Sequence, residues 1–239
     1  MKIKQKKFVI ADIHGNIKAL KQCLERSNFN YDEDMLIVLG DLCDGYKYVK
    51  DCIDELLKIK DYVFVLGNHD KWALDWIETG YIEPNWNRQG GENTLKSYGY
   101  EKPPQAHIDF LNNYHGVYIV EKEDKRYIFV HGGLDWKKPL KEQKLHDIIW
   151  DRKLLHAAWM THTKTKKPNH MYTDFDKVFL GHTTTQFYKT VEPMFVCNIV
   201  ALDTGAGWDG KLTIMDIDTL EYFQSDWCHE LYPDEKGRG

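Results

Sequence analysis

The sequence predicts an α/β fold in which two packed sheets carry helices on their outer faces, within one domain. In the first third of the chain, short apolar runs alternate with helix-like runs. The last third contains several strand-like runs in succession. Strands that are separated by helices pair in parallel, so the first third predicts a mostly parallel sheet. A chain of 239 residues is long enough to bury a sizeable core.

Three strands and three helices are expected in the first 80 residues. The strands are the apolar runs at 7–11, 35–40 and 62–67, and the helices are at 16–27, 48–60 and 69–78. In the first of these helices Ile17, Leu20 and Leu24 share one face, as in an amphipathic helix.

After Gly80 the pattern is less regular. Residues 80–104 contain Pro, Gly and Trp and predict an irregular, cap-like segment with short helices, in which Trp86 either packs in a core or lines a cleft. Further along, we expect a hairpin at 117–133, a helix at 146–159, a polar loop at 161–170, and strands at 177–183, 187–191, 194–205 and 211–218.

Composition excludes several classes of function. The formal net charge of -5 gives no support for a nucleic-acid-binding surface, and the sequence has no apolar run of the roughly 20 residues that a membrane span needs. Five cysteines without a CxxC pair favour reduced thiols, and so a cytoplasmic protein.

Polar side chains follow five of the predicted strands. They are Asp12 and His14, Asp41 and Asp44, Asn68 with His69 and Asp70, His131, and His182. The carboxyl ends of parallel strands meet at one edge of a sheet, where crowded carboxylates repel each other unless cations neutralise them. One bridging carboxylate would hold two ions about 3.5–4 Å apart, an arrangement that activates water and binds a phosphoryl group. We predict two divalent ions, manganese first, with iron, zinc, nickel or cobalt as alternatives.

Each cluster also has an ordinary structural explanation. Asp12 could cap the helix that follows it, and Asp41 and Asp44 could form a turn in which Gly45 takes a positive φ. His131 and His182 could be core histidines. The occurrence of all five clusters in order, each at a strand end, disfavours these explanations.

The motifs "DIHGN", "GDLCDG", "GNHD", "HGG" and "GHT", in this order, resemble those of the calcineurin-like metallophosphoesterases. The later "IIWDRKLL" and "LDTGAGWDGKLTIMD" are similar to the phosphoprotein phosphatase branch, and within it to the phage lambda-type serine/threonine protein phosphatases of phages and bacteria. The resemblance runs from Phe8 to Asp216. It implies a four-layer α/β/β/α sandwich of two mixed sheets, with a dinuclear metal site at the carboxyl edge of the strands.

The resemblance also implies a role for each site residue. Asp12 and His14 would bind one metal ion, Asp41 would bridge both ions, and Asn68, His131 and His182 would bind the second. His69 would be the general acid, oriented by Asp44, and Arg152 would bind phosphate oxygens.

One position departs from the family pattern. The family usually has arginine after the second aspartate of its "GDxxDRG" motif, whereas this chain has Gly45. Arg88, in the cap-like segment, is the candidate replacement as a substrate-binding residue; the ordinary alternative is that Arg88 is a surface residue.

The resemblance implies a phosphomonoesterase of protein-phosphatase type that acts through a metal-activated hydroxide. Its substrate would be a phosphorylated protein or a small phosphoester. One alternative is a nucleotide hydrolase, either a dinucleoside polyphosphate hydrolase or a cyclic-phosphate esterase. Another is a non-catalytic phosphate-binding module, for which Gly45 is the only support.

Overall fold

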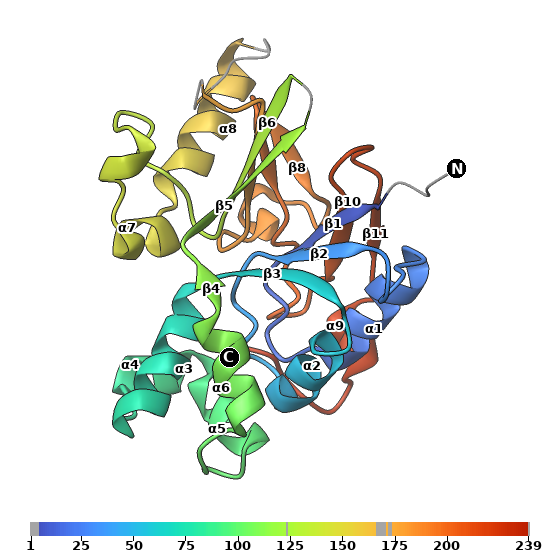
Figure 1. Ribbon diagram of the computed structural model, residues 1–239, viewed down its shortest axis with the longest axis vertical. Helices are drawn as coiled ribbons and strands as arrows, with labels where there is room; N and C mark the ends of the chain where they lie inside the picture. Colours follow the sequence, from blue (N-terminus) through green and yellow to red (C-terminus); the bar gives the residue numbers. More distant parts are fainter. Residues whose placement is uncertain (1–4, 123, 166–170, 172–173, 239) are drawn as a thin grey trace.

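The computed structural model describes residues 5–122, 124–165, 171 and 174–238 (Figure 1). Its first sheet, sheet A, contains β1 (Lys7–Ile10), β2 (Met35–Val38), β3 (Asp61–Val65), β4 (Tyr114–His115), β10 (Thr213–Asp216) and β11 (Tyr222–Gln224). The second, sheet B, contains β5 (Val117–Lys122), β6 (Lys125–Val130), β7 (Lys177–Leu180), β8 (Met194–Val196) and β9 (Ile199–Ala201).

Both sheets are mixed. Sheet A has the order β11-β10-β1-β2-β3-β4, in which β1 to β4 are parallel, β10 runs antiparallel to β1, and β11 runs antiparallel to β10. Sheet B has the order β5-β6-β7-β9-β8, with a parallel centre and an antiparallel strand at each edge. The parallel strands of each sheet therefore send their carboxyl ends to one edge.

The helices cover the outer faces of the two sheets. Those on sheet A are α1 (Ile17–Arg26), α2 (Val49–Leu56), α3 (Asn68–Thr79), α4 (Pro84–Trp86), α5 (Glu92–Ser97), α6 (Gln105–Asn112) and α9 (Cys228–Leu231). On sheet B lie α7 (Leu145–Trp150) and α8 (Lys153–Thr165) (Figure 1). The short π-helix η1 (Asn87–Gly91) and the 3₁₀ helices η2 (Leu140–Glu142) and η3 (Thr185–Tyr188) complete the list.

Side-chain alternation along the strands builds three apolar layers. In β1, Phe8 and Ile10 pack against the helices of sheet A, while Val9 faces the space between the sheets. That middle layer includes Phe129 and Phe179, whose rings stack with centroids 4.7 Å apart. A third layer joins sheet B to α7 and α8. Because successive strand residues point to opposite faces, each sheet supplies two of these layers, and the predicted four-layer sandwich is confirmed.

Some local predictions were wrong. The expected helix at 146–159 is two helices, because the chain turns at Asp151, whose carboxylate accepts a hydrogen bond from the Leu154 amide and caps α8. The expected strand at 187–191 is η3 followed by a left-handed Lys189. Of the expected loop at 161–170, the first five residues continue α8, and 166–170 lie outside the described residues.

The cap-like segment at 80–104 contains the short helices α4, η1 and α5. In the described parts of the chain, no helix has the length and apolar character that a bilayer crossing requires. That residues 1–239 form a single domain stays a prediction.

Phe129 and Phe179 lie on neighbouring strands of sheet B, and their stacked rings in the middle layer should contribute much of the packing of sheet B against sheet A. We expect Phe129→Ala to lower the free energy of unfolding by about 3–5 kcal/mol, because it removes a fully buried ring from the middle layer. Urea unfolding measures this change. Phe187→Ala is the control, since Phe187 is 72% exposed and its loss should change stability by about 0.5 kcal/mol or less. Equal losses in the two variants would contradict the packing argument.

Candidate metal centre

The polar clusters from both sheets converge at one edge. Asp12 and His14 follow β1, Asp41 and Asp44 follow β2, Asn68 and His69 open α3 after β3, and His131 and His182 follow β6 and β7. Backbone hydrogen bonds join these loops: the His14 amide donates to the Asp41 carbonyl, and the Gly181 amide to the His131 carbonyl, each over 2.9 Å. The His182 amide donates to the Asp12 carboxylate over 2.9 Å and so links sheet B to sheet A.

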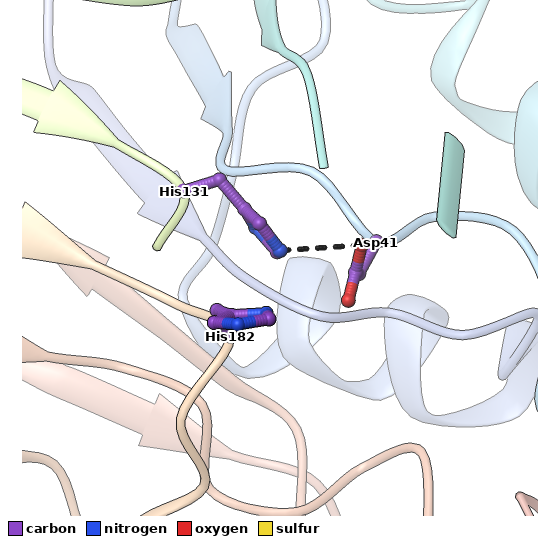
Figure 2. Close-up of side chains that lie close together, drawn as sticks. All are labelled: Asp41, His131 and His182. Atoms are coloured by element: carbon purple, nitrogen blue, oxygen red, sulfur yellow. Dashed lines mark ion pairs between the residues drawn. The ribbon is translucent and has the colours of Figure 1, made fainter. Parts of the chain in front are cut away.

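Two ligand clusters share Asp41. One consists of Asp12, His14 and Asp41, and the other of Asp41, His131 and His182; within each, the ligand atoms lie within 4.8 Å of one another. The two oxygens of Asp41 face different clusters: Oδ2 is 3.7 Å from His14 Nε2, and Oδ1 is 3.2 Å from His131 Nε2. Figure 2 shows the second cluster, in which the three side chains come from separate loops and point toward one another. This is the geometry of a bridging carboxylate.

Backbone carbonyls orient the imidazoles. His14 Nδ1 lies 2.9 Å from the Cys43 carbonyl, and His131 Nδ1 lies 2.6 Å from the Leu39 carbonyl. If Nδ1–H donates to the carbonyl, Nε2 keeps its lone pair for a metal ion. Asn68 Oδ1 lies 3.2 Å from His131 Nε2, so the amide oxygen belongs to the second cluster.

The donors fit divalent ions. His182 Nε2 is buried and has no hydrogen-bond partner among the described residues, which is costly unless an ion satisfies it. Burial lowers the pKa of His14 and of His182 well below the usual range, which favours the neutral form that metal ligation requires.

The pKa values of two buried carboxylates, Asp12 and Asp203, are raised rather than lowered. Burial and the nearby Asp203 raise the pKa of Asp12 well above its usual range, and burial raises the pKa of Asp203 to about 6. Burial also opposes ionisation of Asp41, but His131 and His69 outweigh it and hold the pKa of Asp41 below its usual range. Positive charge at this edge would relieve the crowding of these acids.

The site backbone is strained. Five site residues adopt a left-handed conformation that is uncommon without glycine: Asp12, His14, Asp41, Asp44 and His182, with φ of 54°, 48°, 50°, 72° and 64°. The buried Asp70 carboxylate accepts hydrogen bonds from the amides of Asp41, Leu42 and Cys43 and holds this loop in place. Nothing in the sequence indicated that Asp70 supports this loop.

His69 is paired with Asp44. Its Nδ1 is hydrogen-bonded to Asp44 Oδ2, and its ring lies edge-on to that of His14 at a centroid distance of 5.1 Å. Trp86 Nε1 donates to the same Asp44 carboxylate over 2.8 Å, and Thr94 Oγ1 donates over 2.7 Å. The cap-like segment therefore fixes the partner of His69. From the sequence, Trp86 was expected either to pack in a core or to line a cleft, and nothing indicated that Thr94 contacts Asp44.

Three of the five arginines, Arg152, Arg88 and Arg238, differ in their position relative to the two clusters. Arg152 lies between α7 and α8, and its Nη1 donates to the His182 carbonyl over 2.8 Å and to Thr183 Oγ1 over 3.1 Å. Arg88 is exposed and forms no hydrogen bond or ion pair with any described residue. Arg238, which the sequence did not single out, places Nη1 3.4 Å from His14 Nε2.

Residues 6–186 match the family model of the calcineurin-like phosphoesterases. The chain belongs to this family. Together with the two clusters, this membership makes it a metal-dependent phosphoesterase with a candidate dinuclear site. Which residues hold the ions, and which metal they are, stay predictions.

Individual relatives are distant. The chain is 26% identical to "Serine/threonine-protein phosphatase 2" of Salmonella typhimurium strain LT2, over 88% of this chain and 92% of the relative. It is 25% identical to the symmetrical bis(5'-nucleosyl)-tetraphosphatase of Pseudomonas fluorescens strain SBW25, over 90% and 93%. A metallophosphoesterase structure from Sphaerobacter thermophilus shares the fold with a TM-score of 0.56 and 16% identity, covering 93% of this chain and 89% of that one.

Asp41 should be the least replaceable residue of the site. We expect Asp41→Asn to lower the content of both metal ions and to reduce turnover by at least about 100-fold, because both clusters use this carboxylate. Elemental analysis of the manganese-loaded protein and steady-state kinetics measure the two effects. Asp32→Asn, at an exposed ion pair with Lys60, is the control. Full activity of the Asp41 variant, or of the wild type after exhaustive chelation, would exclude the dinuclear hypothesis.

Proposed function

We propose that the chain is a phosphomonoesterase of the serine/threonine protein-phosphatase type. The observation that carries this choice is how the chain aligns with its relatives. The alignment with the Salmonella phosphatase is 215 residues long, whereas that with the Pseudomonas tetraphosphatase extends over 281 positions, more than the 239 residues of this chain. The alignment therefore includes stretches of the tetraphosphatase that have no counterpart in this chain.

The residues of the site suit phosphoester hydrolysis. Asp12, His14 and Asp41 would hold one ion, and Asp41, Asn68, His131 and His182 the second. Bound divalent ions would polarise the phosphoryl group and make a water molecule nucleophilic. Arg152, whose guanidinium lies beside His182, would bind phosphate oxygens and offset their charge.

His69 would protonate the leaving oxygen. Its Nδ1 is committed to Asp44, so Nε2 is the nitrogen that can deliver a proton. Trp86 and Thr94 hold the Asp44 carboxylate from its other sides, which fixes the imidazole in one orientation. A chain that only binds phosphate has no need for this arrangement.

The rest of the substrate has space beside Arg152. A cavity of about 590 Å³ is lined by Arg152, Trp136, Lys137, Trp150 and others. Such a cavity is large enough for several residues of a phosphorylated peptide or for a nucleoside. A dinucleoside polyphosphate hydrolase is therefore the second candidate, and the tetraphosphatase relatives favour it.

We expect the His69→Asn variant to depend strongly on the leaving group. Alkyl phosphates, whose alkoxide needs a proton, should lose turnover on the order of 10²–10⁴-fold, and activated aryl phosphates should lose much less. Single-turnover kinetics on both substrates, with metal content measured in parallel, provide the test. His115→Asn, at an exposed histidine, serves as the control. An equal loss on both substrates would mean that His69 acts in another way, for example as a metal ligand.

A substrate panel separates the candidate functions. With manganese added, we expect kcat/KM for phosphoserine and phosphothreonine peptides to exceed that for diadenosine tetraphosphate and cyclic nucleotides by at least about tenfold. The reverse order would establish the nucleotide hydrolase instead. Absence of turnover on every substrate, p-nitrophenyl phosphate included, would leave the non-catalytic phosphate-binding module.

A further inference from the structure

Gly45 leaves no room for a side chain. Its φ is +73°, and a Cβ built on it would lie 2.7 Å from both the Cβ and the carbonyl oxygen of His14. The backbone conformation itself also disfavours any residue with a Cβ. An arginine at position 45 would therefore displace a metal-ligating histidine, and a second cation for this side of the site has to come from elsewhere in the chain.

Arg238 reaches this side of the site. Its Nη1 lies 3.4 Å from His14 Nε2, the atom that faces Asp41. The path of its side chain follows from Gly90: a Cβ built there would lie 2.9 Å from the Gly45 amide nitrogen and 3.4 Å from Arg238 Cγ. The stem of Arg238 thus runs past the backbone of Gly45, and its guanidinium extends to the cluster of Asp12, His14 and Asp41.

The segment that carries Arg238 is held in place. The Arg238 amide donates to the Gly207 carbonyl over 2.6 Å, and the guanidinium lies 5.1 Å above the Trp208 ring. Earlier in the segment, Tyr232 stacks on the buried Tyr46 with ring centroids 4.4 Å apart. A cation presented in this way loses little conformational freedom when an anion binds.

The guanidinium still has donors to offer. Among the described residues, no carboxylate lies within 4.0 Å of an Arg238 nitrogen, and its buried Nε has no hydrogen-bond partner. Besides its contacts with His14 and Trp208, the guanidinium donates a 3.4 Å hydrogen bond from Nη2 to Gln89 Oε1. Arg152, by contrast, lies at the cluster of Asp41, His131 and His182. One guanidinium therefore stands at each of the two clusters.

We propose that Arg238 is a second phosphate-binding arginine, which supplies from residues 232–238 the positive charge that Gly45 cannot carry. The inference rests on the proposed phosphoester hydrolysis, because it assigns Arg238 to the oxygens of the same phosphoryl group. Arg152 and Arg238 would contact that group from the two clusters that share Asp41. Arg88, which has no such contact, is not needed for this task.

Binding of inorganic phosphate to the manganese-loaded protein tests the proposal without turnover. By calorimetry we expect Arg238→Ala to raise the phosphate dissociation constant about tenfold or more, with unchanged manganese content. Arg238→Gln keeps most of the side-chain stem and removes the charge. It should raise the phosphate dissociation constant by a similar factor, and it keeps the test valid if the alanine variant folds poorly. Arg238→Lys should lie between, because an ammonium makes no bidentate contact. Lys236→Ala, at an exposed neighbour in the same segment, should match the wild type.

Two results would overturn the proposal. An unchanged phosphate dissociation constant in both Arg238→Ala and Arg238→Gln would show that the guanidinium does not contact the anion. Tighter manganese binding together with faster turnover in those variants would show that it competes with the ion at His14. Failure of the proposed function is distinguishable: the wild type would then hydrolyse no phosphoester, while the effect of Arg238 on phosphate binding would remain.

Discussion

The burial of Asp41 is the constraint on which the rest of the site depends. Its side chain is 1% exposed, and its two oxygens face two different groups of imidazoles. A carboxylate in this position is tolerable only when positive charge or hydrogen-bond donors surround it. The histidines come from loops of both sheets, so the two sheets have to pack with the carboxyl ends of their parallel strands at the same edge. The hydrogen bond from the His182 amide to the Asp12 carboxylate joins the two sheets at the site itself.

Strain in the loops follows from the same constraint. A ligand placed directly after a short buried strand can turn toward the centre only if the chain reverses at once, and several site residues do so with a positive φ. The Asp70 carboxylate compensates for this strain by accepting hydrogen bonds from three successive backbone amides of the Asp41 loop. The cost of the strained backbone is thus offset by hydrogen bonds that the metal ions do not provide.

The sequence predicted the parts of the molecule that are local. Each predicted ligand follows a strand within a few residues, so strand recognition and residue type were sufficient to select the candidates. The order of strand-like and helix-like runs was sufficient to predict two packed sheets with helices outside. The parts that failed depend on distant contacts. Thr94 acts on Asp44 across 50 positions, and Arg238 reaches His14 across 224. The run at 187–191 has β-forming residues, but Thr185 and the left-handed Lys189 close it into a 3₁₀ turn. Apolar pattern carries no information about such partners.

Gly45 shows how a single residue can depend on distant contacts. In the sequence alone, Gly45 stands where the family usually has arginine, and it is the only support for a non-catalytic phosphate-binding module. In the fold, Gly90 of the cap-like segment approaches the Gly45 amide so closely that a Cβ on Gly90 would lie 2.9 Å from it. This approach is what brings Trp86 and Thr94 onto the Asp44 carboxylate, and Asp44 in turn orients His69. The glycine is therefore part of the support of His69, the proposed general acid. The same packing that removes a cation from position 45 leaves the path along which Arg238 approaches the metal centre.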